Sequence, residues 1–124
     1  MGCKEYKSIK MTKTTNPKKI SLMLVEELAE EVKLINVEKK ITWTKNFIIA
    51  TAQNKTHLRT LRESTKIWLK KNGLEGINPE GSEAESEWSL LDLGDTIIHL
   101  MTPAARDYWD IDGLVEECLI VYES

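Results

Sequence analysis

Two short runs of apolar residues, separated by two turn-forming residues, constrain the fold of this chain most strongly. Residues 88–93 and 96–101 flank Gly94-Asp95, and a glycine at the first central position is typical of a type II′ turn. A two-residue turn sets the register between its strands. The sequence therefore predicts an antiparallel hairpin in which each residue has a known neighbour.

The two faces of this hairpin differ in chemistry, because side chains alternate along a strand. The mostly aliphatic face, which we expect in the core, consists of Ser89, Leu91, Leu93, Thr96, Ile98 and Leu100. The other face consists of Trp88, Leu90, Asp92, Ile97, His99 and Met101. A tryptophan beside apolar and polar groups is typical of a protein-binding hot spot. The alternative is that a helix covers this face and makes Trp88 part of the core.

Asp92 and His99 are diagonal neighbours on the second face, roughly 7–8 Å apart at Cα. We predict that they hydrogen-bond and orient each other. No serine or cysteine nucleophile has sequence support for joining them, so we assign no catalytic residue.

Apolar spacing predicts the other elements. We expect a flexible basic arm over 1–20 and a domain over 21–124. Helical spacing predicts a helix over 22–32, with Ser21 as its N-cap, and another over 56–72 that ends at Gly73.

Short apolar runs predict strands over 34–37 and 47–50. A polar loop is expected over 78–87, and a helix from Thr102-Pro103 to about residue 110. Residues 113–122 fit either a helix or a strand. The order α-β-β-α-(β)-β-β-α predicts one α/β domain with a mixed sheet and flanking helices.

The chain has 124 residues, enough for one domain with a real core. Its two cysteines, Cys3 and Cys118, form no disulfide framework or metal motif, which favours a reduced, intracellular compartment. We find neither a secretory signal nor an apolar run of about 18 residues, and therefore expect no membrane association.

Charge is distributed unevenly. Residues 1–20 carry six lysines against one glutamate, whereas residues 77–124 carry one arginine against twelve acidic residues. Four basic residues also lie on one face of the 56–72 helix, namely Arg59, Arg62, Lys66 and Lys70. This stripe could contact rRNA or an acidic partner, or be a solvated helix face.

A series of motifs resembles the ribosomal silencing factor family, also called Iojap, over about residues 22–115. The motifs are Glu80-Gly81, Trp88, Asp92-Leu93-Gly94-Asp95, Ile98-His99-Leu100-Met101, Pro103, Arg106, Tyr108 and Ile111-Asp112, with Thr44, Phe47, Ile49 and Thr56-His57-Leu58 upstream. Lys45, Ala52 and Thr56 depart from the family pattern, and the tryptophan of its C-terminal motif is absent. The chain therefore resembles a divergent member.

The resemblance implies a small domain with nucleotidyltransferase-like topology, and no known catalysis or cofactor. It implies docking on the large ribosomal subunit through its fourteenth universal protein, which blocks subunit joining, or a role in large-subunit assembly. The implied partner-binding residues are Trp88, Leu90, Asp92, Gly94, Asp95, His99, Met101, Arg106 and Trp109. The implied location is the bacterial cytoplasm or the mitochondrial matrix. A mitochondrial member would have acyl carrier protein and an LYR-type protein as further partners.

Two other functions remain open. Asp92 and Asp95 could hold magnesium in a nucleotidyltransferase, although no glycine-rich phosphate loop precedes them. The domain could also be a protein-interaction module unrelated to ribosomes.

Overall fold

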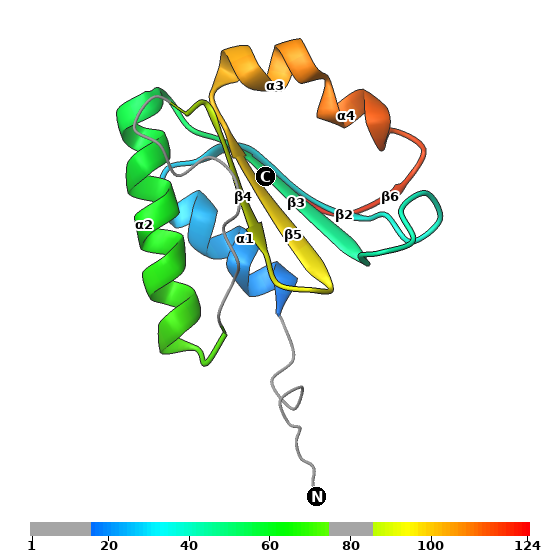
Figure 1. Ribbon diagram of the computed structural model, residues 1–124, viewed down its shortest axis with the longest axis horizontal. Coiled ribbons are helices and arrows are strands. Elements are labelled where there is room, and N and C mark those ends of the chain that lie inside the picture. The colour runs from blue at the N-terminus through cyan, green and yellow to red at the C-terminus, as the bar shows by residue number, and fades with distance from the viewer. Residues whose placement is uncertain (1–15, 75–85) are drawn as a thin grey trace, which may run out of the picture.

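A five-stranded sheet of order β4-β5-β3-β2-β6 lies at the centre of the computed structural model, which describes residues 16–74 and 86–124 (Figure 1). The strands are β2 (Glu30–Asn36), β3 (Asn46–Thr51), β4 (Trp88–Asp92), β5 (Thr96–Met101) and β6 (Leu119–Glu123). β3 and β5 are parallel, whereas the other neighbouring pairs are antiparallel. The predicted mixed sheet is confirmed.

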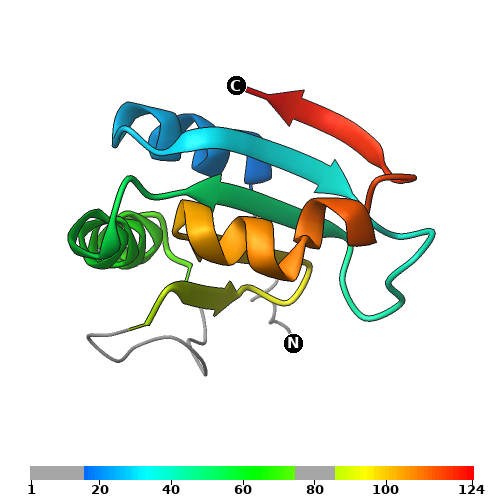
Figure 2. The ribbon, with the colours of Figure 1, turned by 90° about the horizontal axis from the view of Figure 1, so that it is seen from above.

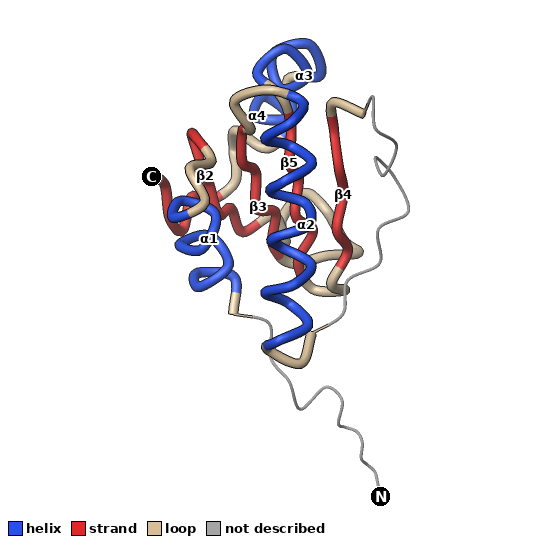
Figure 3. The backbone as a smooth tube through the Cα atoms, turned by 90° about the vertical axis from the view of Figure 1, so that its left-hand side faces the viewer, coloured by secondary structure: helices blue, strands red, loops and turns tan. Residues whose placement is uncertain are grey.

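Helices cover both faces of the sheet. α1 (Pro17–Glu26) and α2 (Lys55–Lys71) lie side by side on one face (Figure 3). α3 (Pro103–Trp109) and the short α4 (Ile111–Leu114) lie on the other face (Figure 2). The buried side chains accordingly form two clusters, one on each side of the sheet.

The hairpin of β4 and β5 has the predicted register. Trp88 pairs with Met101 and Asp92 with Ile97, and the Leu93 N–H donates to the Thr96 carbonyl at 2.8 Å. Gly94 has a φ of +91°, which a residue without a Cβ adopts without strain. The predicted aliphatic face packs under α1 and α2, where its leucines and isoleucine join the larger core cluster.

Two predicted helices are confirmed, together with the predicted stop at Gly73 and the predicted N-cap Thr102. Asn54 caps α2 by accepting from the His57 N–H at 2.8 Å, and Gly73, with a φ of +73°, follows its C-terminus. Thr102 caps α3 by accepting from the Ala105 N–H at 3.3 Å. Gly73 therefore located the end of α2 and Thr102 the start of α3, whereas the N-cap Asn54 was not predicted.

The first helix differs from the prediction at both ends. It begins at Pro17, within the predicted arm, because Asn16 caps it by accepting from the Lys19 N–H at 3.2 Å. Ser21 is therefore inside the helix, where its hydroxyl donates to the Pro17 carbonyl at 2.9 Å. The helix ends at Glu26 rather than near residue 32, and the chain turns at Leu28, which has a φ of +70°.

Most of residues 28–32 therefore turn the chain and start β2, which begins earlier than the predicted 34–37 strand. The ambiguous 113–122 segment contains the end of α4 and most of β6, which pairs with β2 across a bulge at Val121. The predicted 78–87 loop and the optional strand before the hairpin fall largely or wholly outside the described residues. No helix in the described part of the chain is long and apolar enough to cross a membrane.

Candidate functional site

Aromatic side chains gather where the edge strand β4 meets α3. The ring of Trp88 lies 5.7 Å from that of Trp109, and the ring of Tyr108 lies 5.0 Å from Trp109 in an edge-to-face arrangement. Tyr108 is 77% exposed and Trp109 59% exposed, whereas Trp88 is half-buried. We call Trp88, Tyr108 and Trp109 the aromatic surface; the half-buried Leu90 and Asp92 continue it along β4.

His99 supports the aromatic surface from below. The Trp88 indole donates from Nε1 to Nδ1 of His99 at 3.2 Å, and the Phe47 ring lies 4.5 Å from the imidazole. Burial lowers the pKa of His99 from 6.5 to about 3, so the ring is neutral near pH 7. Because Nδ1 accepts, the proton is on Nε2, which has no partner among the described residues.

The predicted hydrogen bond between Asp92 and His99 is wrong. The Asp92 carboxylate instead accepts from the Gly94 N–H at 2.8 Å and closes the turn. A short aspartate side chain readily caps its own turn two residues on, and Trp88 takes the histidine nitrogen instead. Asp92 therefore shapes the hairpin rather than the imidazole.

The structure divides the predicted partner-binding residues into three groups. Gly94, Asp95 and Trp109 are exposed, and Trp88, Leu90 and Asp92 are half-buried. His99 and Met101 are 4% and 0% exposed, because α3 and α4 cover this part of the face, and Arg106, which α3 itself carries, is 7% exposed. For Met101, the alternative prediction that a helix covers this face of the hairpin is correct. The Met101 side chain therefore cannot contact a partner directly.

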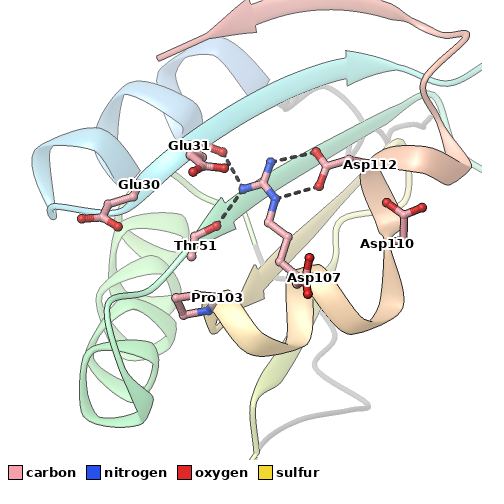
Figure 4. A pocket seen from close by; sticks show the side chains of 8 residues that line it. Glu30, Glu31, Thr51, Pro103, Asp107, Asp110 and Asp112 are labelled. Carbon is pink, nitrogen blue, oxygen red and sulfur yellow. Dashed lines mark hydrogen bonds and ion pairs between the residues drawn. The ribbon is translucent and has the colours of Figure 1, made fainter.

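Arg106 fastens α3 and α4 to the sheet, because it joins Asp112 on α4 to Glu31 and Thr51 on two strands; these three partners are labelled in Figure 4. Its guanidinium donates twice to the Asp112 carboxylate, at 2.8 and 2.9 Å. It also donates to the Glu31 carbonyl at 2.6 Å and to the Thr51 hydroxyl at 2.8 Å. Glu31 has a φ of +47° at an irregularity in β2, so Arg106 holds a strained segment in place.

The Arg106 guanidinium has an electrostatic consequence for its partner. Hydrogen bonding from Arg106, aided by Lys33 at 3.2 Å, lowers the pKa of Asp112 to about 2. We call the Arg106–Asp112 pair the arginine clamp. Around it lies a 330 Å³ hollow with five acidic side chains, namely Glu30, Glu31, Asp107, Asp110 and Asp112. This end of the domain is therefore strongly acidic.

The predicted basic stripe on α2 is incomplete. Arg59, Lys66 and Lys70 are exposed, but Arg62 is only 7% exposed and pairs with Glu63 at 3.3 Å. Arg62 therefore belongs to the packing of α2 and does not present its charge to a partner.

Comparisons with known proteins decide the family. The family model described as "Ribosomal silencing factor during starvation" matches residues 12–123. The chain belongs to the ribosomal silencing factor family.

Individual relatives agree with this assignment. The protein named ribosomal silencing factor RsfS of Chromobacterium violaceum is 32% identical over 97 residues, which span 77% of this chain and 79% of that protein. A crystal structure of a Chromobacterium violaceum protein superposes with a TM-score of 0.69 at 31% identity, covering 81% of this chain and 86% of that one. A mouse protein named for mitochondrial assembly of the ribosomal large subunit is 27% identical over 95 residues, 74% of this chain and 41% of its own.

As a ribosomal silencing factor, the chain belongs to a family that is not a known class of enzymes. The two carboxylates of the magnesium alternative are used in the turn: Asp92 accepts from Gly94, and Asp95 accepts from the Thr96 hydroxyl at 3.1 Å. Within residues 16–74 and 86–124, no three histidine, cysteine, aspartate or glutamate side chains are placed so that they could hold one metal ion.

Sequence reasoning left two exposed aromatic residues of this silencing factor out of the partner-binding set: Tyr108, which was noted only as part of the family motif, and Trp43. Trp43 is 66% exposed in the loop between β2 and β3, beside a 550 Å³ hollow that also contains Gly94 and Asp95. The loop is held to the hairpin because Lys45 N–H donates to the Asp95 carbonyl at 3.1 Å. A tryptophan within a polar segment was the available signal.

Proposed function

We propose that this protein binds the large ribosomal subunit through its fourteenth universal protein and blocks joining of the small subunit. The observation that supports it most directly is the aromatic surface on a member of this family. Trp88, Tyr108 and Trp109 combine exposed ring area with few rotatable bonds, which is typical of residues that dominate binding energy.

Charge supports the choice of a protein partner. Residues 86–124 contain both β4 and α3 and carry nine acidic side chains against one arginine, Arg106, which is buried. Such a surface attracts a basic protein and repels bare phosphate. The exposed Arg59, Lys66 and Lys70 on α2 are then available to neighbouring rRNA or, in a mitochondrion, to acyl carrier protein with an LYR-type protein.

Assistance in large-subunit assembly is the second candidate function. It is favoured by the printed name of the mouse relative, which concerns assembly of the mitochondrial large subunit. Both functions need the same docking step, and the location follows from the host: the cytoplasm of a bacterium or the mitochondrial matrix of a eukaryote.

Subunit joining tests the proposed function. The purified protein is incubated with large subunits, small subunits are added, and joining is followed by light scattering. We expect co-sedimentation with large subunits and reduced joining. Co-sedimentation with normal joining would favour assembly, whereas no co-sedimentation would contradict both functions.

The enzyme alternative has its own test. If the protein acts by binding alone, Asp92→Asn weakens subunit binding by loosening the turn and no nucleotide transfer is detected in either protein. Magnesium-dependent nucleotide transfer by the wild-type protein, lost in Asp92→Asn, would contradict the proposal.

A further inference from the structure

The strand β6 presents an unusually apolar edge. It lies at the opposite side of the sheet from β4 and pairs only with β2 among the described strands (Figure 2). Three consecutive side chains on it are exposed: Leu119 by 69%, Ile120 by 45% and Val121 by 52%. An edge strand also offers backbone N–H and C=O groups that another strand can pair with.

Few of the usual protections against such pairing occur here. Natural edge strands use lysine, proline or bulges. Residues 107–124 contain no lysine, arginine or proline, and the bulge at Val121 and the exposed Glu123 at the end of the strand are the remaining devices. An edge strand with three adjacent exposed apolar side chains and no lysine is typical of an edge that pairs with a binding partner.

Charge around β6 selects the chemistry of that partner. Glu116, Glu117 and Glu123 are exposed before and within the strand. A 360 Å³ hollow beside Ile120 is lined by further acidic side chains, while its lysine, Lys33, is already paired with Asp112 at 3.2 Å. A second copy of the chain would place like-charged β6 strands together, which is unfavourable.

We propose that β6 binds an extended segment of another protein that alternates apolar with lysine or arginine side chains, and that this segment adds to the sheet as a sixth strand. Main-chain hydrogen bonds supply affinity in this mode, and alternate side chains supply specificity. The inference does not depend on the proposed ribosomal function. Because β4 and β6 lie at opposite edges, both surfaces can be occupied together.

A labelled peptide tests this inference. The probe is a ten-residue peptide of alternating valine and lysine, and its control carries N-methyl groups on alternate backbone amides. Fluorescence anisotropy measures binding to the full-length protein. We expect saturable binding of the probe and at least about tenfold weaker binding of the control, because N-methylation removes the strand hydrogen bonds.

Substitutions locate the site. Val121→Lys and Leu119→Lys are each expected to weaken probe binding at least about tenfold by placing charge on the edge. The matched control is Ile67→Lys, on α2 and 57% exposed, which leaves binding unchanged. Circular dichroism confirms that each variant is folded, and Leu119→Lys replaces Val121→Lys if the latter unfolds.

Three results would overturn the inference. Equal binding of the N-methylated peptide would show simple attraction of lysines to an acidic surface. Unchanged binding by both β6 variants would place the site elsewhere. A wild-type dimer in sedimentation equilibrium that Leu119→Lys dissociates would identify a second copy as the occupant.

Discussion

Trp88 donates its indole N–H to Nδ1 of the buried His99 at 3.2 Å, directly beneath the aromatic surface. The hydrogen bond fixes the orientation of a ring that would otherwise rotate at the edge of the sheet. Because only 4% of His99 is exposed, we propose that it affects partner binding through Trp88 and not by direct contact.

The neutral His99 makes stability depend on pH. An unfolded histidine has a pKa of 6.5, and burial lowers the pKa of His99 to about 3. Between these values the unfolded chain binds a proton that the folded chain does not, so stability falls as pH falls. From pH 7 to pH 4.5 we expect this group to cost about 2–3 kcal/mol, and His99→Phe to remove that loss.

Urea unfolding of both proteins at pH 7 and pH 4.5 measures this difference. The wild-type protein should lose more stability than His99→Phe over the interval. An equal loss in the two proteins would mean that His99 is not held neutral.

Arg106 gives a second prediction about stability. Arg106→Lys keeps the charge but loses the paired hydrogen bonds to Asp112 and the reach to Glu31 and Thr51, so we expect a loss of about 3 kcal/mol in unfolding free energy. Arg59→Lys, on the exposed face of α2, is the matched control and should change little. If the two variants are equally stable, the hydrogen bonds of Arg106 contribute nothing to the free energy of unfolding.

Asp112 gives a related prediction about stability at low pH. Its pKa is lowered from 3.8 to about 2 by Arg106, so its stabilising effect is present above pH 3.8 and is lost as pH falls towards 2. Asp112→Asn should therefore show a shallower loss of stability over that window in thermal melts. A slope as steep as that of the wild type would refute this.

Local sequence signals predicted the elements that depend on local chemistry. The hairpin register, the end of α2 at Gly73, the N-cap of α3 and the aliphatic face follow from turn residues, caps and alternation, which act over a few residues. The end of α1 does not follow from such local signals. Val32 fits the helical spacing equally well, but it lies in β2 and packs into the core from that strand. β6 depends on pairing with β2, more than 80 residues earlier, which no local pattern reveals.

The candidate site was only partly predicted, again because local sequence signals do not show how distant elements pack. Trp88 was predicted from the hairpin face and Trp109 from the family resemblance, and the structure brings them together. Met101, His99 and Arg106 share the motif but are buried between the sheet and the helices α3 and α4, and this depends on how the helices return over the sheet. We therefore infer that these three residues hold the aromatic surface in place and do not themselves contact a partner.

The basic N-terminal residues are expected to add salt-dependent affinity for the subunit. Deleting residues 1–15 removes four lysines and one glutamate and spares α1, which begins at Pro17. Binding to whole large subunits should weaken modestly and lose part of its salt dependence, because fewer phosphate contacts remain. Binding to the isolated fourteenth universal protein should stay unchanged; its loss would make these residues the recognition element.

The central claim is that the aromatic surface recognises the fourteenth universal protein of the large subunit. Calorimetric titration of that protein with wild type, Tyr108→Ala and Trp109→Ala tests it most directly, with the exposed Ile67→Ala on α2 as control. We predict a loss of about 2 kcal/mol or more for at least one aromatic variant and none for the control. Wild-type affinity in both aromatic variants, or no binding by the wild-type protein, would contradict the claim.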